Sequence, residues 1–206
     1  AEQLSKEAEL YKLRQQLQPH FLFNALNSIN ALIGTRPAEA REMVQQLSDF
    51  LRTTLKKEEQ QWIQLEDEIH SLQLYLEIEK VRFGHRLHTQ LEFDATAWKM
   101  QVPALLLQPL VENAIKFGLY DTTGEARIYL KADAADGQLI ITVENPFDVE
   151  TAAAQKGTGF GLSSVQRRLY LMFGRNDLLQ TSTKENIFIT KLLIPQPNVS
   201  DVSKSV

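Results

Sequence analysis

The first residue that can carry out chemistry is His20, which lies on a polar strip of a predicted helix. At 100° per residue, Asn24 and Asn27 fall within about 40° of His20. A neutral imidazole carries a nitrogen lone pair that can attack phosphorus, and Asn24 can bind one ring nitrogen while the other attacks. An exposed histidine without a role is the alternative. The apolar residues of this helix half lie opposite His20: Leu22, Leu26, Ile29 and Ile33.

A second set of polar residues recurs at helical spacing over residues 104–117. Glu112, Asn113 and Lys116 share one face with Pro109, while Leu107, Leu110, Val111 and Ala114 form the other face. A carboxylate, an amide and an ammonium can serve a magnesium nucleotide, because oxygen ligands suit the hard cation and positive charge suits phosphate. The alternative is an ordinary solvated helix face.

A glycine-rich segment opens a third candidate site. Gly157, Gly159 and Gly161 precede Leu162 and Ser164 at the start of a predicted helix. Glycines let the backbone approach phosphate oxygens, and a helix N-terminus offers unpaired N–H groups. A flexible turn before a helix is the alternative. The acidic residue that dinucleotide-binding folds place about twenty positions later is missing, which argues against that class.

Composition excludes several classes of protein. The chain has 206 residues, a net charge of −4 and no cysteine, so disulfides and thiolate metal sites are excluded. The negative charge argues against a broad nucleic-acid surface. No apolar run approaches the roughly 18 residues that span a bilayer, and no signal peptide is recognisable. The helical pattern at Ala1, without a methionine, is typical of an excised fragment, which leaves room for membrane segments upstream.

The elements that must position these residues follow from periodicity. Helices over residues 1–34 and 37–59, with a Pro19 kink, predict an antiparallel hairpin that pairs with a second copy as a four-helix bundle. After a third helix over 65–83, the remaining elements predict an α+β sandwich. We expect helices over 104–117 and 162–173, and strands over 87–93, 99–102, 126–132, 138–143, 178–183 and 187–194.

Several segments of the chain resemble motifs of known protein families. Residues 17–29, with the core Pro19-His20-Phe21-Leu22-Phe23-Asn24, resemble the phosphoacceptor box of LytS-type sensor histidine kinases. The segment 75–83 resembles the part of those kinases before the ATPase domain. Residues 107–118 resemble the N-box of the GHKL ATPase superfamily, and residues 157–162 resemble its G-box. The resemblance covers roughly residues 10 to 195.

The resemblance implies ATP and Mg²⁺ as cofactors. It makes His20 the phosphoacceptor, Asn113 the Mg²⁺ ligand, Glu112 a base or orienting group, and Lys116 a phosphate contact. Asn145 stands where most relatives carry an aspartate that reads the adenine amino group. Its amide can accept that hydrogen bond without charge, so we expect modest ATP affinity, and tighter binding with aspartate there.

Three further positions depart from the family pattern. Phe21 follows the histidine where many kinases carry an acidic residue. Phe117 stands before the last N-box glycine, where a histidine is common. Ser164 replaces an asparagine that is often found after the G-box. Together with Asn145, the departures at Phe117 and Ser164 favour a scaffold with a degenerate nucleotide site as one alternative function.

The resemblance implies a two-component sensor kinase, in which ATP phosphorylates His20 and the phosphoryl group passes to an aspartate of a response regulator. Such a chain is a homodimer and the cytoplasmic part of an inner-membrane protein, without nucleic acid as partner. Residues 1–60 would be the dimerisation and phosphotransfer hairpin, 61–195 a Bergerat-type ATP-binding domain with a leading helix, and 196–206 a disordered tail. An ATPase whose Glu112 activates water is the other alternative.

Overall fold

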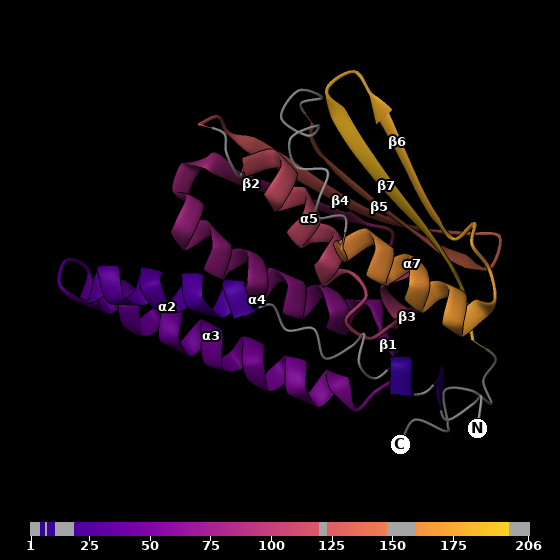
Figure 1. The fold of residues 1–206 in the computed structure, drawn as a ribbon, viewed down its shortest axis with the longest axis horizontal. Helices are drawn as coiled ribbons and strands as arrows, with labels where there is room; N and C mark the ends of the chain where they lie inside the picture. Colours follow the sequence, from indigo (N-terminus) through magenta and orange to yellow (C-terminus); the bar gives the residue numbers. More distant parts are fainter. Residues whose placement is uncertain (1–4, 7, 11–18, 120–122, 148–159, 198–206) are drawn as a thin grey trace.

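The computed structural model describes residues 5–6, 8–10, 19–119, 123–147 and 160–197. Residues 5–6 and 8–10 are helical, and from Pro19 onward the described chain forms an α+β fold (Figure 1). The longer helices are α2 (Pro19–Ile33), α3 (Pro37–Glu58), α4 (Leu65–Phe83), α5 (Gln108–Leu119) and α7 (Phe160–Phe173). The strands are β1 (Trp62–Gln64), β2 (Leu87–Phe93), β3 (Gln101–Pro103), β4 (Ala126–Ala135), β5 (Gln138–Pro146), β6 (Leu179–Lys184) and β7 (Ile187–Pro195).

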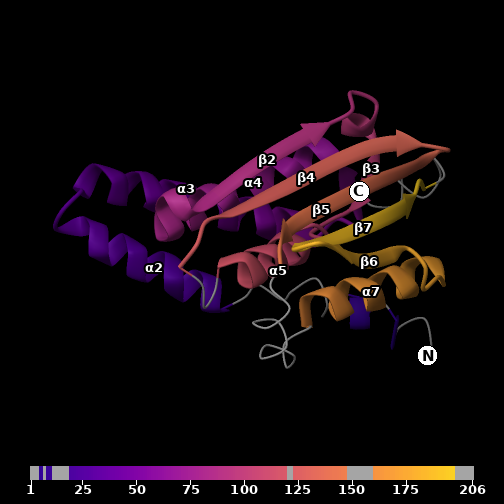
Figure 2. The same ribbon diagram turned by 90° about the horizontal axis from the view of Figure 1, so that it is seen from above.

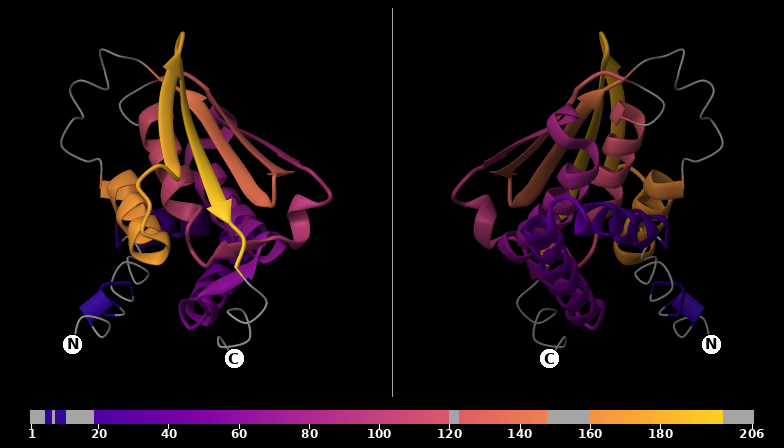
Figure 3. Two further views of the ribbon diagram at one scale, coloured as in Figure 1. Left: turned by 90° about the vertical axis from the view of Figure 1, so that its right-hand side faces the viewer. Right: turned by 90° about the vertical axis from the view of Figure 1, so that its left-hand side faces the viewer.

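Five of the strands form one sheet, in the order β2-β4-β5-β7-β6. The edge strand β2 runs parallel to β4, and the other pairs are antiparallel. The β4–β5 turn places Asp136 and Gly137 at φ 52° and 71°, which is the left-handed conformation that a tight hairpin requires. Helices α5 and α7 lie on the same side of this sheet (Figures 2 and 3). Strands β1 and β3 form a separate antiparallel pair.

Helix α4 lies between the α2–α3 hairpin and the sheet (Figure 1). Three aromatic rings, one each from α2, α3 and α4, pack together where α4 meets the hairpin. The ring of Phe21 on α2 lies 5.2 Å from Phe50 on α3 and 4.9 Å from Tyr75 on α4, between centroids. Such aromatic pairs add stability beyond the apolar area that they bury. A face of the hairpin that was expected to need a second copy is therefore covered within the chain.

The hairpin has a second apolar face, which stays exposed. On α2, Ile29 of the predicted apolar stripe is buried, but Leu26 and Ile33 are 54% and 58% exposed. Helix α2 instead buries the face that carries Phe21, because α4 packs against that face. The buried set on α2 is Phe21, Ala25, Ile29 and Leu32.

The predicted boundaries hold for most elements, and α5 is the main correction. The prediction began this helix at residue 104, whereas α5 begins at Gln108. Residues 104–107 form a turn in which Leu105 has a φ of 60°. Pro109 fits the first turn of α5 because a proline there lacks only an N–H that has no helical partner. The predicted strand over 99–102 is a short 3₁₀ turn, Ala97–Lys99, followed by β3.

The prediction of one helix over residues 1–34 can be compared only in part. Residues 8–10 and 19–33 are helical, and Leu10 is buried. Glu9 pairs with Arg167 of α7 at 2.7 Å. Leu13 and Leu17 lie outside the described residues, as do residues 198–206 of the predicted tail.

Helix α4 buries a carboxylate, Glu79, which is 3% exposed. Burial raises the pKa of Glu79 from its ordinary value of 4.5 to about 7, and the positive charge of Arg82 opposes this shift in part. A carboxyl group whose pKa is raised by folding stabilises the fold when protonated. This contribution is complete below about pH 4.5 and is lost as the pH rises through 7.

We therefore expect Glu79→Gln to stabilise the protein at pH 8 by roughly 3 kcal/mol, because the amide is never ionised. At pH 4.5 the variant and the wild type should unfold with similar free energies, since both side chains are then largely neutral. Urea unfolding at the two pH values measures the difference. A variant that is no more stable than the wild type at pH 8 would show that burial of the ionised Glu79 carboxylate does not destabilise the folded protein.

Candidate active site

Helix α5 brings the three predicted nucleotide motifs together. A Cβ atom on Gly161, at the start of α7, would lie 3.3 Å from the carbonyl oxygen of Pro109. At the other end of α5, a Cβ on Gly118 would lie 3.0 Å from the Cβ of Ala126 and 3.8 Å from Pro146. The first turn of α5 is therefore in close contact with the start of α7, and its last turn with the start of β4 and the end of β5. The two glycines allow these approaches.

The polar residues of α5 differ in exposure. Asn113 is 7% exposed, while Glu112 and Lys116 are half-buried. Glu112 accepts a hydrogen bond from Gln108 Nε2 at 2.7 Å, which orients its carboxylate along the helix. Asn113 thus lies deeper than the predicted polar face implied. A buried amide oxygen beside a carboxylate and an ammonium fits the ligand set of a magnesium nucleotide.

Asn145 lies at the end of β5, on the side of the sheet that α5 and α7 cover. The buried residues Leu139, Ile141 and Val143 alternate along β5, and Asn145 continues their series at 2% exposure. Its Nδ2 donates a hydrogen bond to the carbonyl oxygen of Pro146 at 2.8 Å. Because a carbonyl oxygen only accepts, this bond fixes the amide and leaves Oδ1 as the atom that can accept from a base.

Three phenylalanines from separate elements lie in a row beside Asn145. The ring centroids of Phe117 and Phe147 are 6.5 Å apart, and those of Phe147 and Phe188 are 5.5 Å apart. Phe188 is the strand partner of Asn145. Where the family commonly carries a histidine, Phe117 therefore extends an apolar wall, and a flat base can pack against such a wall.

The glycine-rich segment is described only at its end. Gly157 and Gly159 lie outside the described residues, whereas Gly161, Leu162 and Ser164 are half-buried in the first turns of α7. Leu162 packs against the hydrophobic core. The structure thus places the second half of this motif directly against Pro109 of α5.

His20 is exposed near the start of α2. Asn24, one turn later, lies with its Nδ2 3.2 Å from Nδ1 of His20 and 3.5 Å from Nε2. This is the contact that the sequence predicted. An amide nitrogen only donates, so Nδ1 is the acceptor in this contact. Attack through Nε2 requires the ring proton on Nδ1, and the Asn24 amide must then turn so that its oxygen accepts from that N–H.

Three charged residues near the site were missed by the sequence analysis. Glu68, Lys57 and Arg168 are each less than 5% exposed and contact the turn before α5 or one another. Glu68 lies in the first turn of α4, where an acidic side chain also suits the positive end of the helix dipole. A helical wheel gives the missing signal, because Glu68 shares a face with the apolar residues Leu72 and Tyr75.

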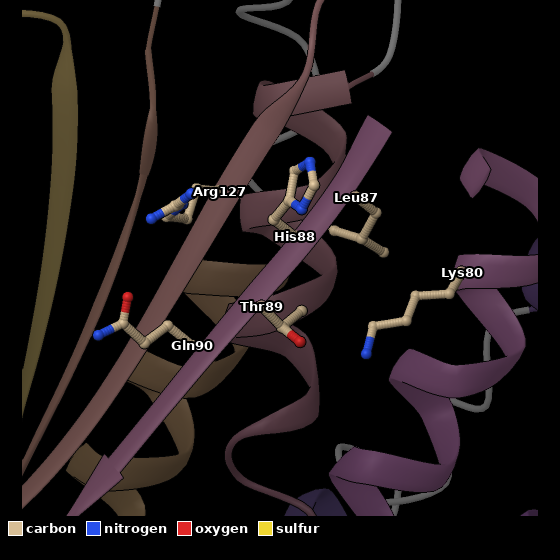
Figure 4. Close-up of a pocket in the computed structure, with 6 residues that line it drawn as sticks. All are labelled: Lys80, Leu87, His88, Thr89, Gln90 and Arg127. Atoms are coloured by element: carbon tan, nitrogen blue, oxygen red, sulfur yellow. The ribbon is translucent and has the colours of Figure 1, made fainter. Parts of the chain in front are cut away.

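A separate pocket of about 370 Å³ lies at the free edge of β2 (Figure 4). Its three basic residues are Lys80, His88 and Arg127. Lys80 is paired with Glu77 at 2.8 Å, and His88 with Glu125 at 3.2 Å. Alternation along β2 places His88 on the opposite face from Leu87 and Thr89, so the lining residues do not converge on one ligand.

Within the described parts of the chain, no three His, Asp or Glu residues cluster closely enough to hold a metal. A site that offers Asn113 and leaves further ligands to nucleotide phosphates is the usual arrangement for Mg²⁺. No helix in the same parts of the chain is both long and apolar enough to cross a bilayer.

Comparison with known proteins gives a family. The profile of the family described as histidine kinase matches residues 8–87. The chain is 32% identical over 209 residues to the sensor protein LytS of Staphylococcus saprophyticus, covering 96% of this chain and 35% of LytS. It is 36% identical over 168 residues to the sensor histidine kinase BtsS of Escherichia coli K12, covering 82% of this chain and 30% of BtsS. The chain spans about a third of the length of these curated relatives.

A solved structure shares the fold. The histidine kinase domain of the blue-light activated histidine kinase EL346 of Erythrobacter litoralis aligns over 98% of this chain and 96% of its own, with a TM-score of 0.51 and 16% identity. The family match and the sequence relatives define the class of this chain as the histidine kinases, and the solved structure shows that it shares their fold. Within that class, the chain belongs to the LytS-type sensor histidine kinases.

The hydrogen bond of Asn145 changes what aspartate would do at this position. We expect Asn145→Asp to lower the free energy of unfolding by about 1–3 kcal/mol. The amide group that donates to the carbonyl oxygen of Pro146 would be replaced by a carboxylate oxygen, which cannot donate. Chemical denaturation at pH 7 measures this loss. Asn27→Asp, at an exposed asparagine of α2, is the matched control and should change stability by less than about 0.5 kcal/mol. Equal effects in both variants would mean that the Asn145 amide is not held by Pro146.

Proposed function

We propose that this chain is the catalytic region of a two-component sensor kinase, which uses Mg-ATP to phosphorylate His20 and passes the phosphoryl group to an aspartate of a response regulator. The observation that carries the proposal is the close packing of α5 against both the start of α7 and the end of β5. Asn113 and Lys116 lie on α5, whose first turn meets the helix of Ser164 and whose last turn meets the end of the strand of Asn145. The same chain exposes a histidine in the phosphoacceptor sequence.

In the proposed reaction, Nε2 of His20 attacks the γ-phosphorus of ATP. A P–N bond forms, and the bond from phosphorus to the bridging oxygen breaks with its electrons going to ADP. The phosphorylated imidazolium then loses its Nδ1 proton to solvent, which reaches His20 because the side chain is exposed. Asn24 holds the ring through Nδ1 while Nε2 reacts.

Phosphoryl transfer requires mainly positioning and charge neutralisation. Asn113 would ligate Mg²⁺ through its amide oxygen, and the ion would withdraw charge from the phosphates. Lys116 lies on the same helix, about one turn beyond Asn113, and can approach a phosphate oxygen. The carboxylate of Glu112, oriented by Gln108, would position the nucleotide or the attacking ring. Oδ1 of Asn145 would accept from the adenine amino group.

The partner and the cellular setting follow from the same proposal. The response regulator would receive the phosphoryl group from the exposed His20. Segments outside this chain, in the two thirds of the relatives that it does not match, would sense the signal and hold the kinase at the membrane. Residues 1–60 would supply the phosphotransfer hairpin, and residues 61–195 the ATP-binding domain.

Two variants separate the phosphoacceptor from the nucleotide site. His20→Gln should abolish stable phosphorylation and keep ATP affinity, whereas Asn113→Ala should remove Mg-dependent ATP affinity. Incubation with γ-labelled ATP, followed by acid and alkali treatment, measures the first effect, and calorimetric titration measures the second. Phosphohistidine is labile in acid and stable in alkali. Free labelled phosphate without bound label would indicate the ATPase function, and neither product would indicate a scaffold.

We also propose that the exposed face of the hairpin pairs with a second copy of the chain. Leu26 and Ile33 on α2, with Val44 and Leu55 on α3, are all more than half exposed. Residues of this kind are rarely gathered on one surface of a monomer without a partner. This face is distinct from the one that α4 covers, so the intrachain packing leaves it available.

Glutamate at both Leu26 and Val44 should therefore give a monomer, because four charges would be buried in each dimer. Sedimentation velocity at tens of micromolar measures the oligomeric state of the whole chain. Gln45→Glu is the control, since Gln45 is exposed on α3 but lies about 100° from Val44. A wild-type chain that sediments as a monomer, or a double variant that remains a dimer, would contradict this assignment of the dimer face.

A further inference from the structure

The buried carboxylate of Glu68 contacts two backbone N–H groups in front of α5. Glu68 lies in the first turn of α4 and is 3% exposed. Its Oε1 accepts from the N–H of Leu107 at 3.2 Å, and its Oε2 accepts from the N–H of Leu105 at 3.2 Å. A side chain of α4 thus provides the acceptors for a turn that lies 37 and 39 residues away in sequence.

The turn that Glu68 stabilises contains an unfavourable backbone conformation. Leu105 has a φ of 60°, which costs free energy for a residue other than glycine. A buried N–H without an acceptor would add a further cost. Glu68 therefore stabilises a conformation that the local sequence does not favour by itself.

This turn determines where α5 begins. The carbonyl oxygen of Leu107 accepts from the N–H of Leu110 at 3.0 Å and of Val111 at 3.2 Å, which are the first bonds of the helix. The N–H of the same Leu107 is held by Glu68. Displacement of the carboxylate would therefore move the first turn of α5, and Glu112 and Asn113 follow directly after Val111.

Two cations complete the arrangement around the turn. Lys57, in the last turn of α3, lies with its Nζ 3.5 Å from Oε2 of Glu68, and both side chains are nearly buried. Burial lowers the pKa of Lys57, and the charge of Glu68 opposes this shift. From the other side, Arg168 of α7 donates through Nη2 to the carbonyl oxygen of Ala104. The turn is thus held by α4 and by α7, the helix that carries the second half of the glycine motif.

We infer that Glu68 is a positioning residue for the nucleotide site, which sets the first turn of α5 so that Asn113 and Glu112 meet Mg-ATP. The inference rests on the proposed kinase function. Lys57 neutralises the carboxylate, but the two acceptor bonds to Leu105 and Leu107 do the positioning. Removal of the Lys57 cation should therefore leave the start of α5 in place, whereas removal of an acceptor oxygen of Glu68 should shift it.

Two variants break the same ion pair, but only one of them changes the acceptors for Leu105 and Leu107. Lys57→Met additionally removes the hydrogen bond from Nζ to the carbonyl oxygen of Asp67. Glu68→Gln replaces one carboxylate oxygen by an NH₂ group, which cannot accept from a backbone N–H. Lys57→Met removes the cation and leaves both oxygens of Glu68 in place. Both variants should unfold at lower denaturant concentration than the wild type, because each disturbs a buried pair.

Only Glu68→Gln should affect the nucleotide. We expect its Kd for Mg-ATP and its KM for phosphohistidine formation to rise about tenfold, while Lys57→Met stays within about twofold of the wild type. The rate at saturating ATP should change much less than KM in both variants, since His20 is untouched. Calorimetric titration gives Kd, and labelled ATP gives KM and kcat, at a temperature where circular dichroism shows that each variant is folded.

A merely structural Glu68 would give another pattern, in which the change in Kd follows the loss of stability equally in both variants. That pattern, or an unchanged Kd in Glu68→Gln, would overturn the inference and leave the proposed function intact. A wild type that does not bind ATP would overturn both. If Glu68→Gln does not fold, Glu68→Asp replaces it, because the shorter side chain keeps the charge but cannot reach both N–H groups. The same tenfold rise is expected for Glu68→Asp.

Discussion

Helix α4 is packed on two sides, and the placement of the hairpin relative to the sheet depends on this constraint. Its buried residues span about half of the helix circumference, from Ile69 and Leu76 on one flank to Ser71 and Ile78 on the other. Tyr75 lies between them and meets the aromatic rings of the hairpin. A helix buried this widely cannot rotate about its axis without breaking one of its two interfaces. It therefore fixes the hairpin and the sheet relative to each other.

Burial on two sides also explains why α4 carries ionisable groups inside the protein. Each charged side chain on the buried half of this helix is removed from water and needs a partner or a proton. Glu68 has Lys57 and two backbone N–H groups. Glu79 instead has a pKa raised to about 7, so that a large fraction of it is protonated near neutral pH. The two carboxylates thus represent two different solutions to the same desolvation cost.

Much of the fold was predictable from the sequence because it depends on local signals. Amphipathic periodicity in helices, the Asp136-Gly137 turn and the alternation of apolar residues in strands are each set by residues close together in the chain. The helices and strands that these signals predict appear within a few residues of the predicted bounds. The start of α5 was predicted four residues too early, because the backbone of the preceding turn is satisfied by Glu68, which is distant in sequence. The apolar stripe of α2 was assigned by period alone, whereas the partner that covers it, α4, decides which of its two apolar faces is buried. For the site, residue types and motif order predicted which elements meet. The bond from Asn145 to the next carbonyl was not predictable, because it depends on a side-chain torsion.

The contrast between the two halves of the proposed site follows from what each must do. At the end proposed to read the base, Asn145 is buried, bonded to the carbonyl oxygen of Pro146 and paired across the sheet with Phe188. A fixed acceptor selects among bases because a wrong hydrogen-bonding edge leaves a buried polar group unsatisfied. His20, in contrast, lies on the exposed side of α2 and contacts Asn24, which is itself on the surface. In the proposed reaction this histidine must meet ATP in one step and a response regulator in the next, and an exposed ring can be reached by both. The buried aromatic contact of Phe21, next to His20 in sequence, holds the helix in place while the histidine beside it stays accessible.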